Sequence, residues 1–107
     1  MSNSINETIE QLINNNRVVL FMKGNKTAPQ CGFSATVVNV LNNFNLQYLD
    51  IDVLKDQEIR QGIKEFSDWP TIPQLYIDQE FIGGCDIVRE MYQSGQLKIL
   101  LEQNKLI

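Results

Sequence analysis

The sequence predicts an α/β domain in which helices cover both faces of a mixed four-stranded sheet. Two observations lead to this prediction. Segments with helical periodicity alternate with short apolar segments typical of strands, and two closely spaced strand segments in the second half predict a hairpin. Because 107 residues are the usual length of one domain, residues 1–107 are expected to fold as a single unit.

The first half of the chain predicts helix, strand, helix and strand in that order. Ser4 and Glu7 have the spacing of a capping box, and the apolar residues that follow share one helical face. The run VVLFM is typical of a strand buried on both faces. The expected elements are a helix over residues 4–14, a strand over 18–22, a loop over 24–30, a helix over 33–44 and a strand over 46–53.

The second half predicts a helix, a β-hairpin and two further helices. Asp56 is expected to cap the first of these helices and Asp86 the second, since a carboxylate accepts hydrogen bonds from free N–H groups at a helix start. The segment WPTIP excludes helix and opens the hairpin. The expected elements are a helix over residues 57–66, strands over 74–77 and 81–82, and helices over 87–93 and 97–104.

Composition restricts the classes of partner and compartment. The formal net charge is −4 and the chain has no run of Lys or Arg, so neither nucleic acid nor an anionic membrane surface is an expected partner. The longest apolar run is far shorter than the roughly 20 residues that span a bilayer. The polar, acidic N-terminal segment resembles neither a signal nor a transit peptide, and we expect a cytoplasmic protein.

The chain has two cysteines, Cys31 and Cys85, and no histidine. In an intracellular protein two distant cysteines do not form a disulfide framework. Without histidine there is no Cys-His nucleophile pair, and two thiols alone cannot complete a four-coordinate metal site.

Cys31 is expected at a strand-to-helix junction, where the helix dipole and free N–H groups favour thiolate over thiol. Lys23, at the end of the preceding strand, adds a nearby cation. From position alone, a buried structural cysteine is an equally reasonable interpretation. Pro29 and Gly32 favour the interpretation in which the sulfur is presented to solvent, because they delay the helix and leave space beside the thiol.

Ser34 stands where a dithiol oxidoreductase carries its second cysteine, and a hydroxyl cannot resolve a mixed disulfide. Disulfide reduction through a C-x-x-C pair is therefore excluded. Three uses of the thiolate stay open: exchange with an external thiol, redox sensing through a disulfide to Cys85, and metal ligation.

Four ordered motifs together resemble the monothiol glutaredoxins of the CGFS type. The resemblance runs from about Ser4 to Leu101. The motifs are Lys23-Gly24, Pro29-Gln30-Cys31-Gly32-Phe33-Ser34, Trp69-Pro70-Thr71-Ile72-Pro73-Gln74-Leu75 and Gly83-Gly84-Cys85-Asp86. The resemblance implies a thioredoxin-like fold, glutathione binding, and a 2Fe-2S cluster that bridges two subunits and is passed to recipient proteins.

By resemblance, Cys31 is the iron ligand and the reactive thiol. Pro73 is expected in the cis form, which leaves the backbone of Ile72 to pair with the glutathione peptide. Lys23 and Arg60 are expected to hold the glycine carboxylate of glutathione.

The γ-glutamyl end of glutathione is expected at Gly84, Cys85 and Asp86. Backbone N–H groups at the helix start would hold its carboxylate and the Asp86 side chain its ammonium. Trp69 is interpreted as a packing or partner-contact residue, and Phe33 as either a core residue or part of the rim of the site.

The resemblance also implies partners and leaves the enzyme class open. The expected partners are a second copy of the chain when the cluster is bound, a BolA-type protein as a possible heterodimer partner, and iron-sulfur recipient proteins. The alternative function is a glutathione-dependent thiol transferase that removes glutathione from protein thiols with Cys31 alone. The long segment 24–30 before the cysteine argues against fast turnover, and Cys85 keeps redox sensing open.

Overall fold

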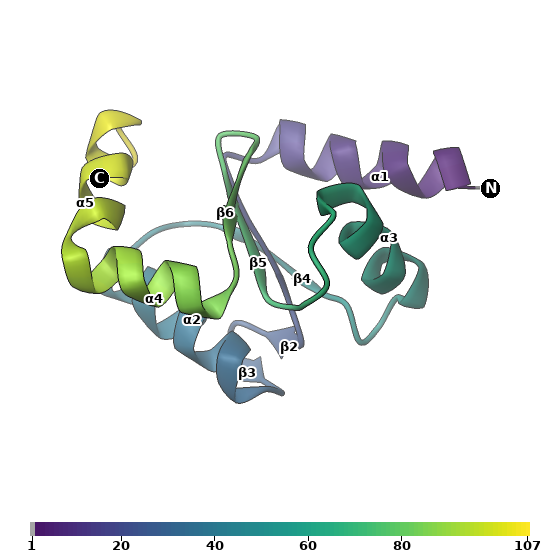
Figure 1. The fold of residues 1–107 in the computed structure, drawn as a ribbon, viewed down its shortest axis with the longest axis horizontal. Coiled ribbons are helices and arrows are strands. Elements are labelled where there is room, and N and C mark those ends of the chain that lie inside the picture. The colour runs from purple at the N-terminus through teal and green to yellow at the C-terminus, as the bar shows by residue number, and fades with distance from the viewer. Residues whose placement is uncertain (1) are drawn as a thin grey trace.

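A mixed four-stranded sheet lies at the centre of the structure, a computed structural model that describes residues 2–107 (Figure 1). Along the chain the elements are α1 (Ser2–Asn15), β1 (Val18–Met22), β2 (Gly24–Asn25), β3 (Ala28–Pro29), α2 (Gly32–Asn43), β4 (Leu49–Asp52), α3 (Gln57–Ser67), β5 (Gln74–Ile77), β6 (Glu80–Gly83), α4 (Cys85–Ser94) and α5 (Gln96–Gln103).

The strand order of the sheet is β4-β1-β5-β6. β1 pairs parallel with β4 and antiparallel with β5, and β5 pairs antiparallel with β6. The expected mixed sheet with a hairpin is therefore confirmed. All five residues of β1 are buried, as its uninterrupted apolar sequence predicts for a strand covered on both faces.

Two apolar cores lie on opposite faces of the sheet, because successive side chains of a strand point to opposite sides. Val18, Leu20 and Met22 pack into one core with residues of α2, α4 and α5. Val19 and Phe21 pack into the other with residues of α1 and α3. The helices therefore cover both faces, as predicted, and β1 belongs to both cores.

Two of the three predicted helix caps are wrong. α1 begins at Ser2, so Ser4 lies inside the helix and accepts a bond from Thr8 Oγ1 through its carbonyl at 3.0 Å instead of capping. α4 begins at Cys85 with Gly84 in extended conformation as its N-cap, which places Asp86 in the first turn. The cap at Asp56 is confirmed: Oδ1 accepts from the backbone N–H groups of Glu58 at 3.0 Å and Ile59 at 3.1 Å.

Segment 24–30, expected to be a loop, contains a short β-hairpin of β2 and β3. Asn25 Oδ1 stabilises the turn by accepting from the backbone N–H groups of Thr27 at 3.0 Å and Ala28 at 2.8 Å. At the end of the hairpin, Gln30 N–H donates to the carbonyl of Lys23 at 2.9 Å. The chain thus returns to the end of β1 just before Cys31.

β4 holds this hairpin in place through two carboxylates. Asp52 Oδ1 accepts from the Gly24 N–H at 3.0 Å, and Asp50 Oδ2 accepts from the Lys26 N–H at 2.9 Å. The Lys26 ammonium donates to the carbonyl of Tyr48 at 3.2 Å. The approach of the chain to Cys31 is therefore fixed by a strand that comes later in the sequence.

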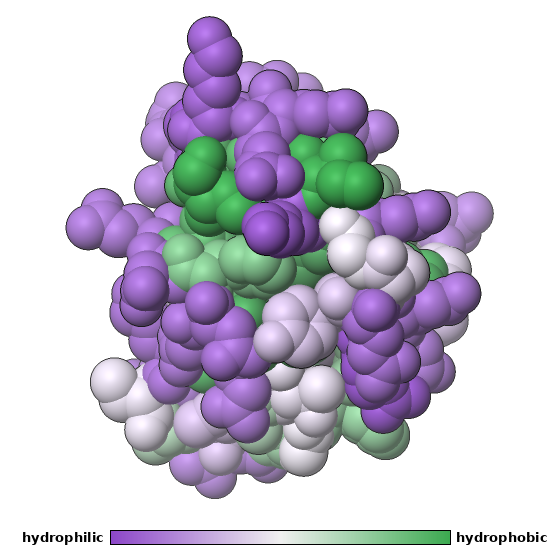
Figure 2. All heavy atoms as spheres, turned by 90° about the vertical axis from the view of Figure 1, so that its left-hand side faces the viewer, coloured by the Kyte–Doolittle hydropathy of each residue, from purple (hydrophilic) through white to green (hydrophobic). Residues whose placement is uncertain are grey.

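Partly exposed apolar side chains gather at the end of the molecule formed by α4, α5 and the C-terminal residues (Figure 2). They include Tyr92, Ile99 and Ile107. Tyr92 lies near the C-terminal end of α4, whereas the pocket described below lies at its N-terminal end, so the two surfaces are separate. Within residues 2–107, no helix is long and apolar enough to cross a membrane.

Gly24→Ala should destabilise the fold more than Gly95→Ala. Both glycines have φ of +84°, which costs a residue with a Cβ about 1–2 kcal/mol. A Cβ at Gly24 would also lie 2.6 Å from Ala28 O and from Gln30 N, whereas a Cβ at Gly95 has no neighbour within 4 Å. We expect a loss of about 1 kcal/mol for Gly95→Ala and at least about 1 kcal/mol more for Gly24→Ala in urea unfolding. Equal losses would contradict the tight packing of the hairpin.

Candidate functional site

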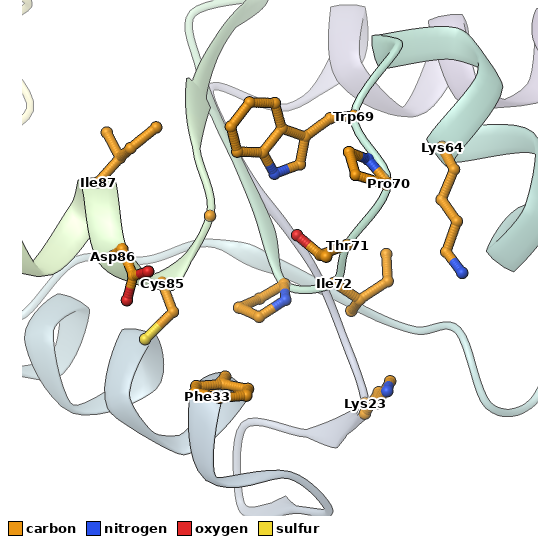
Figure 3. Close-up of a pocket in the computed structure, with 12 residues that line it drawn as sticks. Lys23, Phe33, Lys64, Trp69, Pro70, Thr71, Ile72, Cys85, Asp86 and Ile87 are labelled. Carbon is orange, nitrogen blue, oxygen red and sulfur yellow. The ribbon is translucent and has the colours of Figure 1, made fainter.

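A cavity of about 410 Å³ lies where the end of β1 and the starts of α2 and α4 meet the segment that precedes β5 (Figure 3). Its lining residues are Lys23, Phe33, Lys64, Trp69, Pro70, Thr71, Ile72, Pro73, Gly84, Cys85, Asp86 and Ile87. Of the residues predicted for the site, the cavity thus brings together Lys23, Ile72, Pro73, Gly84, Cys85 and Asp86.

The segment from Trp69 to Pro73 forms one wall of the cavity. The Ile72–Pro73 peptide bond is cis, as the family resemblance predicts. The buried Gln74 side chain supports the segment from behind, because its Nε2 donates to the carbonyls of Trp69 and Thr71, each at 3.2 Å. The backbone of Ile72 is thereby held at the cavity, while its pairing with a peptide stays a prediction.

Cys31 is the N-cap of α2 and is partly exposed. The pKa of its thiol is lowered from the ordinary value, chiefly by the backbone N–H of Ser34. Partial burial opposes this effect, and the Phe33 N–H, the Lys23 charge and the Ser34 hydroxyl add to it. Cys31 does not line the cavity itself, but Lys23 and Phe33 do. An accessible thiol with a lowered pKa therefore lies beside the cavity.

Ser34 is fully buried and connects β1 to α2. Its hydroxyl accepts a hydrogen bond from the backbone N–H of Lys23 at 3.1 Å. A hydroxyl can accept and donate at the same time, so Ser34 can also favour the Cys31 thiolate. Ser34 thus stands in place of a second cysteine, and its hydrogen bond also holds Cys31 close to the charge of Lys23.

Two ammonium groups, those of Lys23 and Lys64, lie on one side of the cavity (Figure 3). Arg60, predicted for this role, is half-buried on α3 and is not among the lining residues. Its contact with a ligand stays a prediction. Sequence reasoning missed Lys64, although it lies four residues after Arg60 and therefore on the same face of α3.

The opposite side of the cavity is formed by the start of α4. Asp86 is exposed there, whereas Cys85 is only 8% exposed. Asp86 accepts from Arg89 at 3.2 Å, a surface contact that leaves its carboxylate available. The first N–H groups of a helix lack partners within the helix and favour an anion. This side can therefore hold a group that carries both a carboxylate and an ammonium.

Trp69 also faces the cavity, and its ring packs against Phe81 with 5.7 Å between centroids. The sequence interpretation of Trp69 as a packing residue is thus confirmed in part. Phe33 is 62% exposed, so it belongs to the rim and not to the core. Thr71, which also lines the cavity, was missed because a lone threonine in a turn carries no distinctive signal.

A zwitterionic peptide with a free carboxylate at one end and an α-amino acid group at the other fits this charge distribution. The ammonium groups of Lys23 and Lys64 match the first, and Asp86 with the start of α4 matches the second. Within residues 2–107, no group of three or more His, Cys, Asp or Glu side chains is placed to hold a metal ion.

Comparison with known proteins identifies the family. The family model described as glutaredoxin matches residues 18–82. A probable monothiol glutaredoxin 2 from Rickettsia conorii is 60% identical over 94 residues, which are 88% of each chain. The chain belongs to the monothiol glutaredoxin family. A monothiol glutaredoxin from Synechocystis is 56% identical over 94 residues, again 88% of each chain.

Solved glutaredoxin structures confirm the thioredoxin-like fold. Reduced apo GrxS14 from poplar superimposes with a TM-score of 0.79 at 50% identity, covering 91% of this glutaredoxin and 89% of the poplar chain. A buckwheat glutaredoxin in complex with glutathione superimposes with a TM-score of 0.86 at 25% identity, covering 99% and 94% of the two chains.

Ser34→Ala should raise the pKa of the Cys31 thiol, because it removes a hydroxyl that favours the thiolate. The measurement is the pH dependence of alkylation by iodoacetamide in a Cys85→Ser background, so that only Cys31 reacts. The midpoint should lie below that of an unfolded thiol, about 8.5, and should move upward in Ser34→Ala. Thr36→Ala is the matched control, since this hydroxyl on the same helix donates to the Gly32 carbonyl at 3.0 Å. A midpoint unchanged by Ser34→Ala would contradict the assignment.

Proposed function

We propose that this monothiol glutaredoxin binds glutathione in the cavity and, as a dimer, carries a 2Fe-2S cluster to recipient proteins. The observation that carries the proposal is the pairing of one accessible thiol, whose pKa is lowered, with a cavity charged oppositely at its two ends. The motif Cys31-Gly32-Phe33-Ser34 and the family membership support the same function.

The charges of the cavity support glutathione as the ligand. Lys23 and Lys64 would hold the glycine carboxylate, and Asp86 would hold the ammonium of the γ-glutamyl group. Ile72 precedes the cis proline and lies outside any helix. Its backbone would pair with the central peptide group of glutathione. The thiol of the bound peptide would then lie toward Cys31, between Lys23 and Phe33.

Ligand counting supports a dimer. A 2Fe-2S cluster takes four ligands, usually thiolates, and Cys31 is the one accessible thiol among residues 2–107. Two chains and two glutathione molecules supply four thiolates. Thiolates that are not covalently part of the chain leave when the peptide dissociates, which suits transfer of the cluster to another protein. In a heterodimer with a BolA-type protein, the partner would have to supply the ligands that the second chain and its glutathione otherwise give.

Cys31→Ser should abolish cluster binding and keep the fold, because serine is a favourable N-cap for α2. Cys85→Ser should retain most of the cluster, since Cys85 is buried. Both variants are reconstituted without air in the presence of glutathione, and visible absorption and iron content are measured. Loss of the cluster in Cys85→Ser but not in Cys31→Ser would overturn the ligand assignment.

The second candidate function is glutathione-dependent thiol transfer, which the lowered pKa of Cys31 favours, because the thiolate is the attacking species. In this reaction the Cys31 thiolate attacks a protein-glutathione disulfide, forms a disulfide with glutathione and releases the protein thiol; a second glutathione then reduces Cys31 and leaves as oxidised glutathione. Wild-type turnover comparable to that of a dithiol glutaredoxin, measured side by side, would favour this enzyme over the carrier.

A further inference from the structure

The indole N–H of Trp69 is buried and, within residues 2–107, has no hydrogen-bond partner. Trp69 lines the cavity, and it is the single tryptophan of the chain. An indole nitrogen can only donate, so it needs an acceptor. Because buried polar groups are nearly always paired, this donor points to an acceptor that comes into place when the cavity is occupied.

Thr71 and Trp69 direct polar atoms to the same space beside Gly84. The position that a Cβ would occupy on Gly84 lies 3.2 Å from Pro73 O, 3.4 Å from Trp69 Nε1 and 4.0 Å from Thr71 Oγ1. The nitrogen of the indole ring faces the Thr71 side of the cavity (Figure 3). A side chain at position 84 would fill this space, and glycine leaves it open.

The two residues differ in access to the cavity. Thr71 is exposed, so its hydroxyl can reach a ligand, whereas Trp69 Nε1 is sealed from solvent. A threonine hydroxyl accepts one hydrogen bond while it donates another. The buried N–H can therefore act on a ligand through Thr71 after rotation of that side chain. The Trp69 ring is held for this by its contact with Phe81.

We propose that Trp69 is a positioning residue that orients the Thr71 hydroxyl toward the α-carboxylate of an amino acid group bound at the start of α4. When the ligand binds, Thr71 Oγ1 accepts from the indole N–H and donates to the carboxylate. The inference rests on the proposed function in one respect, namely that glutathione is the ligand. It adds a polar contact for the γ-glutamyl group from the wall opposite Asp86.

The indole N–H gives a direct signal, because one tryptophan yields one indole resonance in a ¹H–¹⁵N spectrum. Saturating glutathione should move this resonance downfield and slow its exchange with solvent in the wild-type chain. Thr71→Val, which removes the hydroxyl and keeps the shape, should abolish the shift. Thr71→Ser should restore it. An indole resonance that glutathione leaves in place would overturn the inference.

Affinities test the coupling between the two residues. Trp69→Phe and Thr71→Val should each raise the Kd for glutathione roughly 3- to 10-fold. The double variant should be no weaker than the weaker single variant, because both substitutions break the same chain of hydrogen bonds. Multiplicative losses in the double variant would contradict the relay. Circular dichroism checks that Trp69→Phe keeps the fold.

The ligand offers a matched control. γ-Aminobutyryl-cysteinylglycine is glutathione without the α-carboxylate, so Trp69→Phe and Thr71→Val should bind it as well as the wild-type chain does. An equal loss with this analogue would show a structural effect and overturn the inference. Wild-type protein that fails to bind glutathione would contradict the proposed function, whereas binding without coupling between Trp69 and Thr71 contradicts only the relay.

Discussion

The site depends on one partly buried hydrogen bond, from the backbone N–H of Lys23 to the hydroxyl of Ser34. This bond joins the end of β1 to the first turn of α2 and so fixes Cys31 at the helix start. There the free N–H groups and the Lys23 charge act together on the sulfur. At the position where a dithiol enzyme carries its second cysteine, this chain places a group that is needed for structure. Ser34 is therefore the reason both that no second thiol can resolve a mixed disulfide and that Cys31 is held at the helix start.

The constraint extends through the hairpin of β2 and β3. Asp50 and Asp52 on β4 hold the hairpin by accepting from its backbone N–H groups, and the hairpin delivers the chain to Cys31. Because β4 pairs with β1 in parallel, these two carboxylates lie beside the start of the hairpin, where they bind Gly24 and Lys26. The cavity is in turn completed by the cis Ile72–Pro73 segment, supported by Gln74. The thiol and the cavity are thus placed by contacts between segments far apart in the sequence.

Much of the fold was predictable because burial leaves a periodic pattern. The uninterrupted apolar run of β1 predicted a central strand, and the spacing of apolar residues predicted the first three helices. The hairpin of β2 and β3 was not predictable, because its polar segment is ordered by the carboxylates of Asp50 and Asp52, which lie on β4. The predicted helix begins at residue 87, whereas α4 begins at Cys85, because Gly84 in extended conformation is the N-cap in place of the expected Asp86. Arg60 and Lys64 lie on one face of α3, and the position of α3 relative to the cavity decides which of them lines the cavity. For this reason Arg60 was predicted from the sequence and Lys64 was missed.

In the proposed function, glutathione supplies the thiolates that a single accessible cysteine cannot. Native mass spectrometry of protein reconstituted with iron and sulfide without air tests it most directly, in parallel samples with and without glutathione. We predict that the cluster forms only with glutathione, as a dimer with one 2Fe-2S cluster and two glutathione molecules, and that chelation returns apo monomer. A stable cluster dimer without glutathione would contradict the claim and would make Cys31 and Cys85 the ligand pair.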